Sequence, residues 1–266
     1  MDKWEDRRIL ILGNTYPSYS FKYTENACTG GLREGTLEMV RLHPIPLRYL
    51  EEGSRFSAFQ WIKVRMTRHT SDPRPESYRI DFNKVEVQEK IPSDHQKERR
   101  RYIEGSPHLF SSLEELKERQ QLDGTSLGIV QPRKILDCRL ERKSEHERQE
   151  WLDKEKALLS QEPLFGERIK PIDFPEVRFL VKWRCEDTRC PTHEMSLLQW
   201  GLHELYRKYR GSPECEEKVL GAMWSRLDLE KRDVFLFLGS FRGHQHNFGL
   251  MDSYSPEKQQ QGDLFG

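Results

Sequence analysis

The sequence predicts a mainly β protein with helical insertions, an α+β fold. Its apolar residues fall in short runs, several of which alternate with polar residues, and Gly or Pro bounds many of them. At roughly 100–150 residues per domain, a chain of 266 residues predicts two domains or one elaborated domain. Only 35% of the residues are hydrophobic, but 6 Trp, 9 Tyr and 13 Phe supply volume for modest cores.

The charge balance excludes proteins that act through a strong field of one sign. The chain has 44 Lys and Arg and 44 Asp and Glu, so its formal net charge is zero. This excludes a globally basic nucleic-acid coat and an acidic chaperone-like chain, while a local basic face stays open. No apolar run approaches the roughly 18–20 residues of a membrane span. The five cysteines are too scattered for a disulfide framework. We therefore expect a cytoplasmic protein with no membrane partner.

Residues 1–90 are predicted to form a first, strongly bent β-domain. Strands are expected at Arg8–Leu12, Ala27–Gly31, Leu37–Leu42, Trp61–His69 and Tyr78–Phe82. Within Trp61–His69 apolar and polar residues alternate, which is typical of a half-buried strand. Tyr78–Phe82 follows a proline-rich turn and is its expected hairpin partner. The prolines of His43–Pro46 end the preceding strand because proline lacks the N–H that a central strand donates.

Residues 91–125 are predicted to be a helical connector. A helix is expected over Pro92–Glu104, and its basic run Lys97–Arg101 is interpreted as a solvated face or as the extension of a basic patch. A second helix is expected to begin at a capping box formed by Ser111 and Glu114 and to end near Gly124.

Residues 126–254 are predicted to be a second β-domain with helical insertions, followed by a polar tail over residues 255–266. Strands are expected at Ser126–Val130, Lys134–Arg142, Glu176–Cys185, Asp233–Gly239 and Asn247–Tyr254. The highly charged Glu141–Ala157 predicts a protruding, solvated helix. Two further helices are expected, one from a capping box at Ser196–Gln199 to Gly211, and one from Ser212–Pro213 to Leu227.

Four stretches together resemble the bacterial dual-OB-domain family, which is associated with defence and other conflict gene neighbourhoods. They lie at Gly13–Gly31, Arg41–Val64, Phe179–Trp200 and Asp233–Gly239. The resemblance covers nearly the whole chain and implies two OB-like small β-barrels packed together. OB barrels commonly bind single-stranded nucleic acid or oligosaccharides. The resemblance brings no catalytic residues with it.

The strand Trp61–His69 and its hairpin partner form the candidate nucleic-acid interface. Binders of single strands combine cations that follow the backbone with rings on which bases stack. The candidate residues are Trp61, Lys63, Arg65, Arg68, Arg74 and Arg79. The alternative interpretation is an ordinary strand, with its aromatic ring in the core and its cations in water.

Cys185, Cys190 and His193 are candidate metal ligands, spaced C-x4-C-x2-H. A structural zinc site needs four ligands, so the fourth would come from His203, Cys215, His244 or His246. None of these completes a familiar half-site, and two idle thiols beside a helix start are the alternative. No other cofactor is expected.

The last residues resemble the pentapeptide that binds the bacterial DNA sliding clamp. The motif is Gln, Leu or any residue, Ser or Asp, Leu, Phe, and the matching positions here are Gln261, Asp263, Leu264 and Phe265. Gly262 departs from the preferred Leu. A Leu-Phe pair on a polar tether suits a partner's apolar pocket, and Gln offers a bidentate amide. Gln161–Phe165 echoes the motif, with Pro163 as a departure.

Three functions are therefore compared. The first is a nucleic-acid-binding accessory protein of a bacterial defence or DNA-maintenance system, tethered to the sliding clamp. The second is a nuclease or nucleotide-processing enzyme of a defence system, although no GxxxxGK[ST], GxGxxG, GxSxG or HExxH motif is present. The third is a protein–protein module inside a defence complex. Because nonspecific affinity grows with the number of phosphates neutralised, zero net charge predicts weak nucleic-acid binding.

Overall fold

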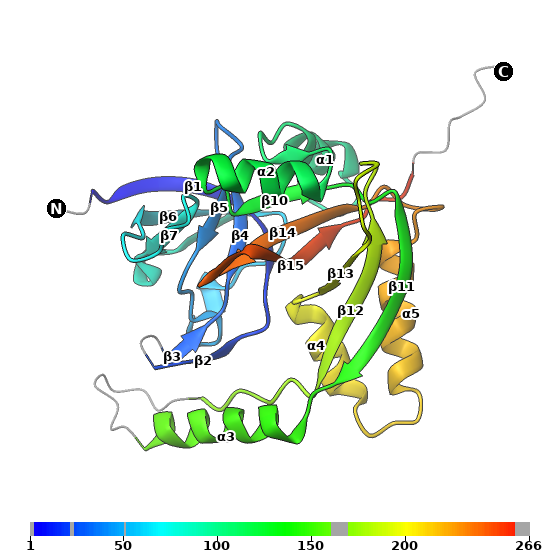
Figure 1. Ribbon diagram of the computed structural model, residues 1–266. Helices are drawn as coiled ribbons and strands as arrows, with labels where there is room; N and C mark the ends of the chain where they lie inside the picture. Colours follow the sequence, from blue (N-terminus) through cyan, green and yellow to red (C-terminus); the bar gives the residue numbers. More distant parts are fainter. Residues whose placement is uncertain (1–2, 22–23, 51, 161–169, 259–266) are drawn as a thin grey trace.

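The structure is a computed structural model that describes residues 3–21, 24–50, 52–160 and 170–258. Within these ranges the chain forms fifteen strands and five α-helices, which confirms the predicted mainly β fold with helical insertions (Figure 1). No described helix is long and apolar enough to cross a membrane.

Five strands in the first part of the chain close into a barrel. They are β1 (Glu5–Asn14), β4 (Thr29–Arg33), β5 (Met39–Leu42), β6 (Gln60–Arg68) and β7 (Ser77–Ile80). Their order around the barrel is β1-β4-β5-β7-β6, and β6 returns to β1. The first half of β1 pairs with β6 and its second half with β4. All neighbours are antiparallel except β5 and β7, which are parallel. We call this unit the first barrel.

The alternation predicted for Trp61–His69 places one side of β6 inside the first barrel. Ile62, Val64 and Met66 are fully buried and pack with Ile9 and Ile11 of β1. Three short strands lie outside the five-strand ring. β8 (Glu86–Lys90) adds to the edge of β6, and β2 (Ser18–Ser20) pairs with β3 (Thr24–Asn26) in a hairpin between β1 and β4. None of the three was predicted, because short edge strands leave little periodic signal.

The second part of the chain forms two sheets around one core. One sheet has the order β15-β14-β10-β9 and the other β11-β12-β13. Their bounds are β9 (Leu109–Phe110), β10 (Leu127–Val130), β11 (Lys134–Arg142), β12 (Val177–Arg184), β13 (His193–Ser196), β14 (Phe235–Phe241) and β15 (His244–Tyr254). A parallel bridge between Leu197, just after β13, and Leu250 of β15 joins the two sheets. We call this unit the second β-domain.

The strand order of the second β-domain repeats that of the first barrel. β10 and β11 follow one another and act as one bent first strand, since β10 pairs with β14 and β11 pairs with β12. From there the order continues through β13 and, by the parallel bridge, to β15 and back to β14. With strands counted along the chain, both units have the order 1-2-3-5-4-1, with strands 3 and 5 parallel.

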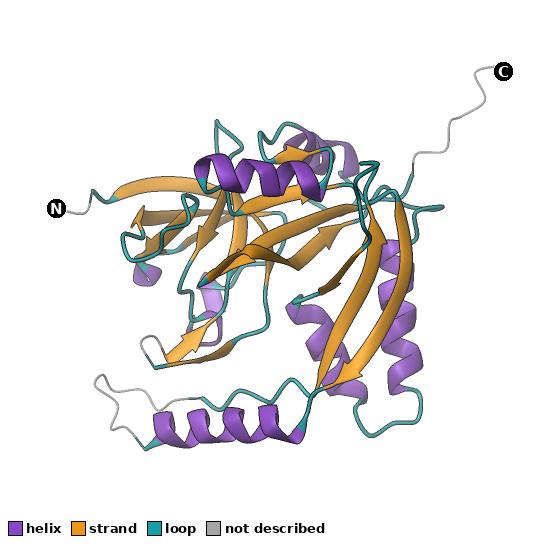
Figure 2. Cartoon of the chain, in the orientation of Figure 1, coloured by secondary structure: helices purple, strands orange, loops and turns teal. Residues whose placement is uncertain are grey.

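The five helices fill the connections between strands (Figure 2). They are α1 (Gln96–Glu104), α2 (Leu113–Asp123), α3 (Glu145–Leu159), α4 (Trp200–Tyr209) and α5 (Cys215–Leu227). The predicted capping box of Ser111 and Glu114 does not form. The N-cap of α2 is Ser112, which accepts from the Glu115 N–H, and the Glu115 carboxylate accepts from the Ser111 N–H. This helix ends at Gly124, as predicted, where the left-handed backbone with φ of 81° favours glycine.

Two further predictions about the helices are also wrong. The capping box at Ser196–Gln199 does not form, because Ser196 is the last residue of β13 and α4 begins at Trp200. The predicted charged helix forms as α3, but it does not protrude. It lies against the β2–β3 hairpin, where Tyr19 donates to Glu155 and the Trp151 ring packs on Tyr19 at 5.0 Å (Figure 1).

A third core joins the two units. Leu10, Leu32 and Met39 on the outer side of the first barrel pack against Phe237 and Met251 of the second β-domain. A buried polar network crosses the same boundary. Arg41 of β5 donates to the Ser126 side chain at 2.9 Å and to its carbonyl at 3.2 Å. Because a lost partner would leave a buried cation without compensation, this network fixes how the two units sit against each other.

Candidate functional site: the cleft between the two units

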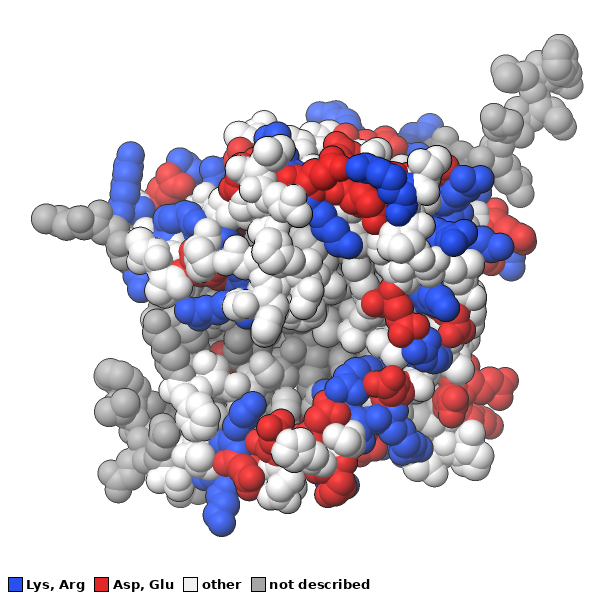
Figure 3. All heavy atoms as spheres, viewed as in Figure 1, with Lys and Arg blue, Asp and Glu red and all other residues white. Residues whose placement is uncertain are grey.

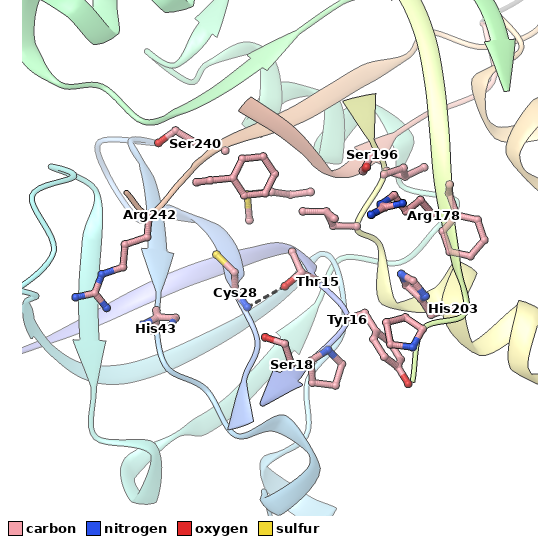
Figure 4. A pocket seen from close by; sticks show the side chains of 18 of the residues that line it. Thr15, Tyr16, Ser18, Cys28, His43, Arg178, Ser196, His203, Ser240 and Arg242 are labelled. Atoms are coloured by element: carbon pink, nitrogen blue, oxygen red, sulfur yellow. Dashed lines mark hydrogen bonds between the residues drawn. The ribbon is translucent and has the colours of Figure 1, made fainter. Parts of the chain in front are cut away.

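A cleft of about 430 Å³ lies between the first barrel and the second β-domain. Its walls come from both units: the segment after β1, the ends of β5 and β14, the start of α3, and strands β12 and β13. Figure 4 shows Arg242 and His43 on one side of this cavity and Arg178 and His203 on the other. In the space-filling view the hollow lies above α3, with charged side chains on its α3 rim (Figure 3). We call it the inter-domain cleft.

The β14–β15 turn places an exposed ring and an exposed cation at one edge of the cleft. The turn consists of Arg242 and Gly243, and Phe241 precedes it as the last residue of β14. Phe241 is 41% exposed, although it is a large apolar residue. Its ring lies over Gly249. A Cβ added at Gly249 would come within 2.7 Å of the ring, so only glycine leaves room for the ring at this position. Arg242 donates to the Ser71 carbonyl of the first barrel at 3.1 Å.

The opposite wall carries a group of uncharged rings. The Tyr16 and His203 rings lie 4.4 Å apart, and His203 meets Phe179 edge-on at 4.7 Å. Burial lowers the pKa of His203 to about 3, so this imidazole is neutral at pH 7. Burial, reinforced by the negative charge of Asp173, raises the pKa of Tyr16 to about 12. These rings therefore offer aromatic faces and a hydroxyl, while the charge on this side of the cleft comes from Arg178 and Lys143.

Cations outnumber anions among the described residues that line the cleft. The cations are Arg41, Arg74, Lys143, Arg178 and Arg242, and Glu147 is the one acidic residue among these lining residues. They differ in how far protein partners already satisfy them. Arg178 bonds Glu141 at 2.8 Å and Glu147 at 2.5 Å. The pKa of Lys143 lies below its usual value, because burial lowers it by more than the nearby Glu147 carboxylate raises it.

Arg74 is committed to the fold although it was predicted to contact nucleic acid. It is 6% exposed and holds the buried carboxylate of Asp72 at 2.9 and 2.6 Å, with a further bond to the Ser240 carbonyl at 2.6 Å. Burial alone would raise the pKa of Asp72, but the hydrogen bonds from Arg74 outweigh it and hold this pKa well below the usual range. The pair bridges the two units at the edge of the cleft.

Trp61 also departs from its predicted role. It shares one face of β6 with Lys63 and Arg65, as the alternation requires, but it is only 5% exposed. Tyr102 of α1 meets its ring edge-on at 5.6 Å, and Arg8 lies over it at 5.0 Å. Its ring is therefore covered and not available for stacking on a base. The sequence could not reveal this, because the residue that covers it comes from a helix 41 positions later.

The other predicted interface residues lie on the outside of the first barrel, away from the cleft lining. Lys63 forms an exposed ion pair with Glu86 at 3.7 Å, and Arg65 is exposed. Arg68 donates to the Ser77 carbonyl at 2.6 Å, and Arg79 lies 6.0 Å from the centre of the Trp4 ring. The fold brings these four cations onto neighbouring strands, but without the ring predicted to stand among them.

The three predicted metal ligands do come together, with a fourth partner that the sequence did not suggest. The ligand atoms of Glu114, Cys185, Cys190 and His193 all lie within 4.8 Å of one another. Glu114 belongs to the first turn of α2 and lies 71 residues before Cys185, so no spacing rule connects them. The expectation of a fourth ligand from His203, Cys215, His244 or His246 is wrong.

The predicted clamp-binding residues lie outside the described residues. These are Gln261, Asp263, Leu264 and Phe265. The similar stretch Gln161–Phe165 also falls outside the described ranges. Both remain predictions from sequence.

The fold and the cleft define a class: a β protein of two units with a common strand order, whose loops meet at a shared groove. Residues 109–266, more than half of the chain, match the family model described as domain of unknown function DUF8757, and the chain belongs to this family. Residues 5–105 match the model described as domain of unknown function DUF8758. No curated protein matches the chain. The boundary between the two models falls inside the predicted connector of residues 91–125.

Sequence reasoning missed the residues that now stand out at the cleft, above all Phe241 and Arg242. One signal was present. A ring and a cation adjoin Gly243, which separates two predicted strands, and side chains at a tight turn are seldom buried. The contribution of Lys143 had no such signal, because its place in the cleft depends on how the two units pack.

Proposed function

We propose that the protein binds single-stranded nucleic acid in the inter-domain cleft, and that both of its units are OB-like barrels. The basis for the second part is the order 1-2-3-5-4-1 with a bent first strand, which suits the five-stranded Greek-key barrel of OB folds. A further support is that helices or short 3₁₀ turns occupy the connection between strands 3 and 4 in both units.

One observation carries the proposal: the ligand-binding loops of two OB barrels would converge on one cleft. OB folds bind through the face of strands 2 and 3 and through the loops joining strands 1–2 and 4–5. In the first barrel these loops contribute Tyr16 and Arg74, and in the second β-domain they contribute Trp151 and Arg242. Four loops of the kind that hold ligands in OB folds therefore border one cavity, and this supports a ligand site there.

The chemistry of the cleft favours a polyanion with stackable rings over an oligosaccharide. Single-strand binding needs cations beside aromatic faces, and Arg242 beside the exposed Phe241 meets that need. Because Arg74 and Arg178 are already paired with carboxylates, few cations are left to neutralise phosphates. We therefore expect weak binding, with dissociation constants of about 1–100 μM at physiological salt.

The test is fluorescence anisotropy of labelled single-stranded DNA and RNA oligonucleotides over a salt series. The variant Phe241→Ala/Arg242→Ala is expected to weaken binding by about 10-fold or more, because one stacked ring contributes about 1–3 kcal/mol. Lys63→Ala/Arg65→Ala, which removes two exposed cations from the other predicted face, serves as the matched control and is expected to change affinity by less than about 2-fold. A larger loss in the control would move the interface to β6, and no binding by the unaltered protein would refute the proposal. Cleavage of the oligonucleotide would favour the nuclease alternative.

We further propose that the tail tethers this weak binder to the bacterial sliding clamp, as an accessory protein of a defence or DNA-maintenance system. The support is the sequence pattern of Gln261, Asp263, Leu264 and Phe265. A tether raises the effective concentration of the cleft near DNA, which compensates for a low intrinsic affinity.

Calorimetry of purified clamp against the full chain tests the tether. We expect micromolar affinity, which Leu264→Ala/Phe265→Ala abolishes while the melting temperature stays unchanged. Lys258→Ala, just before the tail pentapeptide, is the matched control and should bind normally. Absence of heat at high micromolar concentrations would contradict the tether but would leave the nucleic-acid proposal standing.

A further inference from the structure

Four side chains with metal-ligating atoms converge where the first turn of α2 meets the β12–β13 turn. The Nε2 atom of His193 lies 3.3 Å from the Cys185 sulfur, 3.2 Å from the Cys190 sulfur and 3.2 Å from Oε1 of Glu114. The Cys185 sulfur lies 3.0 Å from Oε2 of Glu114. Ligand atoms around a tetrahedral zinc ion, with bonds of about 2.0–2.3 Å, are separated by about 3.3–3.8 Å. These four separations are within several tenths of an ångström of that range, and all the ligand atoms lie within 4.8 Å of one another.

The cluster is protected from water on most sides. Cys185 is 3% and His193 is 5% exposed, and the Glu114 side chain is 13% exposed. The Trp183 ring lies 4.8 Å from the His193 ring and shields it. Two thiols, an imidazole and a carboxylate gathered in this way form an unusual set for a structural core, because a thiol is only a weak hydrogen-bond donor and acceptor.

The backbone around the cluster is shaped for ligation. Thr192, directly before His193, has a φ of 88°, which is an outlier for a β-branched residue. Its hydroxyl accepts from Nε of Arg184 at 2.8 Å, which holds the turn in place. The Cys185 N–H points at the Cys190 sulfur at 3.4 Å, an arrangement that would stabilise a thiolate. A turn that only reversed the chain would need neither feature.

We infer that Glu114, Cys185, Cys190 and His193 bind one zinc ion with a structural role. Two sulfurs, one nitrogen and one oxygen in a compact tetrahedral set suit Zn²⁺, whereas Mg²⁺ and Ca²⁺ prefer oxygen ligands. Cys185 and Cys190 lie in the turn between β12 and β13, His193 is the first residue of β13, and Glu114 lies on α2, 71 residues before Cys185. The ion thus fastens α2 to the second β-domain at a point distant in sequence. Leu116 of α2 packs against Gly128 of β10, so the same helix also covers the other sheet.

The site is tested by metal analysis of the full chain, purified under reducing conditions from cells supplied with zinc. We expect about one zinc per chain by mass spectrometry of the metal. X-ray absorption should show two sulfur ligands at about 2.3 Å and two nitrogen or oxygen ligands at about 2.0–2.1 Å. Removing the metal with a chelator should lower the midpoint temperature of unfolding by about 5 °C or more, and adding zinc back should restore it.

Variants separate ligation from folding. Cys190→Ser and Glu114→Gln are expected to lower the zinc content at least several-fold, whereas Cys215→Ser, which replaces a cysteine outside the cluster, should keep one zinc. Since a ligand variant can fail to fold, Co²⁺ added to metal-free unaltered protein gives a second readout: intense visible bands of tetrahedral cobalt with thiolate ligands. Less than about 0.1 zinc per chain after dialysis against Zn²⁺ and no cobalt bands would overturn the inference.

Discussion

The turns that join strands 4 and 5 differ sharply between the two units, although both reach the same cleft. In the first barrel, residues 69–76 carry a buried ion pair, Asp72 with Arg74, that holds the units together. In the second β-domain the equivalent turn has two residues, and Phe241 and Arg242 beside it remain exposed. The position of a cation in a loop therefore does not show whether it is available to a ligand. Its partners in the protein determine this: the Arg74 guanidinium is buried against the Asp72 carboxylate, whereas Arg242 is exposed to solvent.

The two units also close their cores differently between strands 3 and 4. The first barrel uses the loop after β5 with two short 3₁₀ turns, at Leu47–Tyr49 and Glu52–Ser54. The second β-domain inserts α4 and α5, which pack Leu202, Val219 and Met223 into its core. The same strand order thus occurs with two different segments between strands 3 and 4. Strand pairing, and not the inserted segment, determines the order.

Removing the carboxylate of the buried ion pair should have the largest effect on stability. Asp72→Asn leaves the Arg74 charge buried without compensation, so we expect the free energy of unfolding to fall by about 3–5 kcal/mol. Asp81→Asn, which breaks an exposed pair with Lys84, is the control and should cost less than about 1 kcal/mol. Urea denaturation at pH 7 measures both. Equal losses of unfolding free energy in the two variants would show that the buried pair in the 69–76 turn does not hold the two units together.

A second buried carboxylate, Asp252 of β15, should behave in the opposite way. It accepts from Gln199 at 2.7 Å, but its nearest cation, Arg226, is 3.9 Å away. Burial raises the pKa of Asp252 to about 6, against 3.8 for an exposed carboxyl. The folded state is therefore penalised as the pH rises from about 4 to 6, and the penalty stays constant above pH 6.

Asp252→Asn should remove that penalty. We expect the variant to be about 1–3 kcal/mol more stable than the unaltered protein at pH 7, and the gain to vanish below about pH 3, where the carboxyl is protonated in both states. Asp72 has the reverse sign: its pKa is held below the usual range, so its contribution is present above pH 4 and is lost as the pH falls further. Stability curves of both variants from pH 2 to 8 check the two signs. A gain for Asp252→Asn that did not depend on pH would contradict the assignment.

The sequence predicted most of the elements but little of the cleft. Strand β11 was predicted with its observed bounds, and Leu127–Val130, Val177–Arg184 and Phe235–Phe241 lie close to the predicted ranges, because alternation and apolar runs are local signals. The burial of Trp61 by Tyr102, and the meeting of Glu114 with Cys185, depend on contacts between distant segments. Such contacts leave no periodic trace, so the site could only be assembled from the structure.

Photo-crosslinking can show whether single-stranded nucleic acid binds in the inter-domain cleft, because it locates the bound strand without altering the protein. The full chain is irradiated with a single-stranded oligonucleotide that carries 5-iodouracil, and the cross-linked peptides are identified by mass spectrometry. If the strand binds in this cleft, we expect cross-links at its aromatic residues Phe241, Tyr16 and Trp151. Cross-links confined to the outer face of β6 and β7, around Lys63, Arg65 and Arg79, would contradict it.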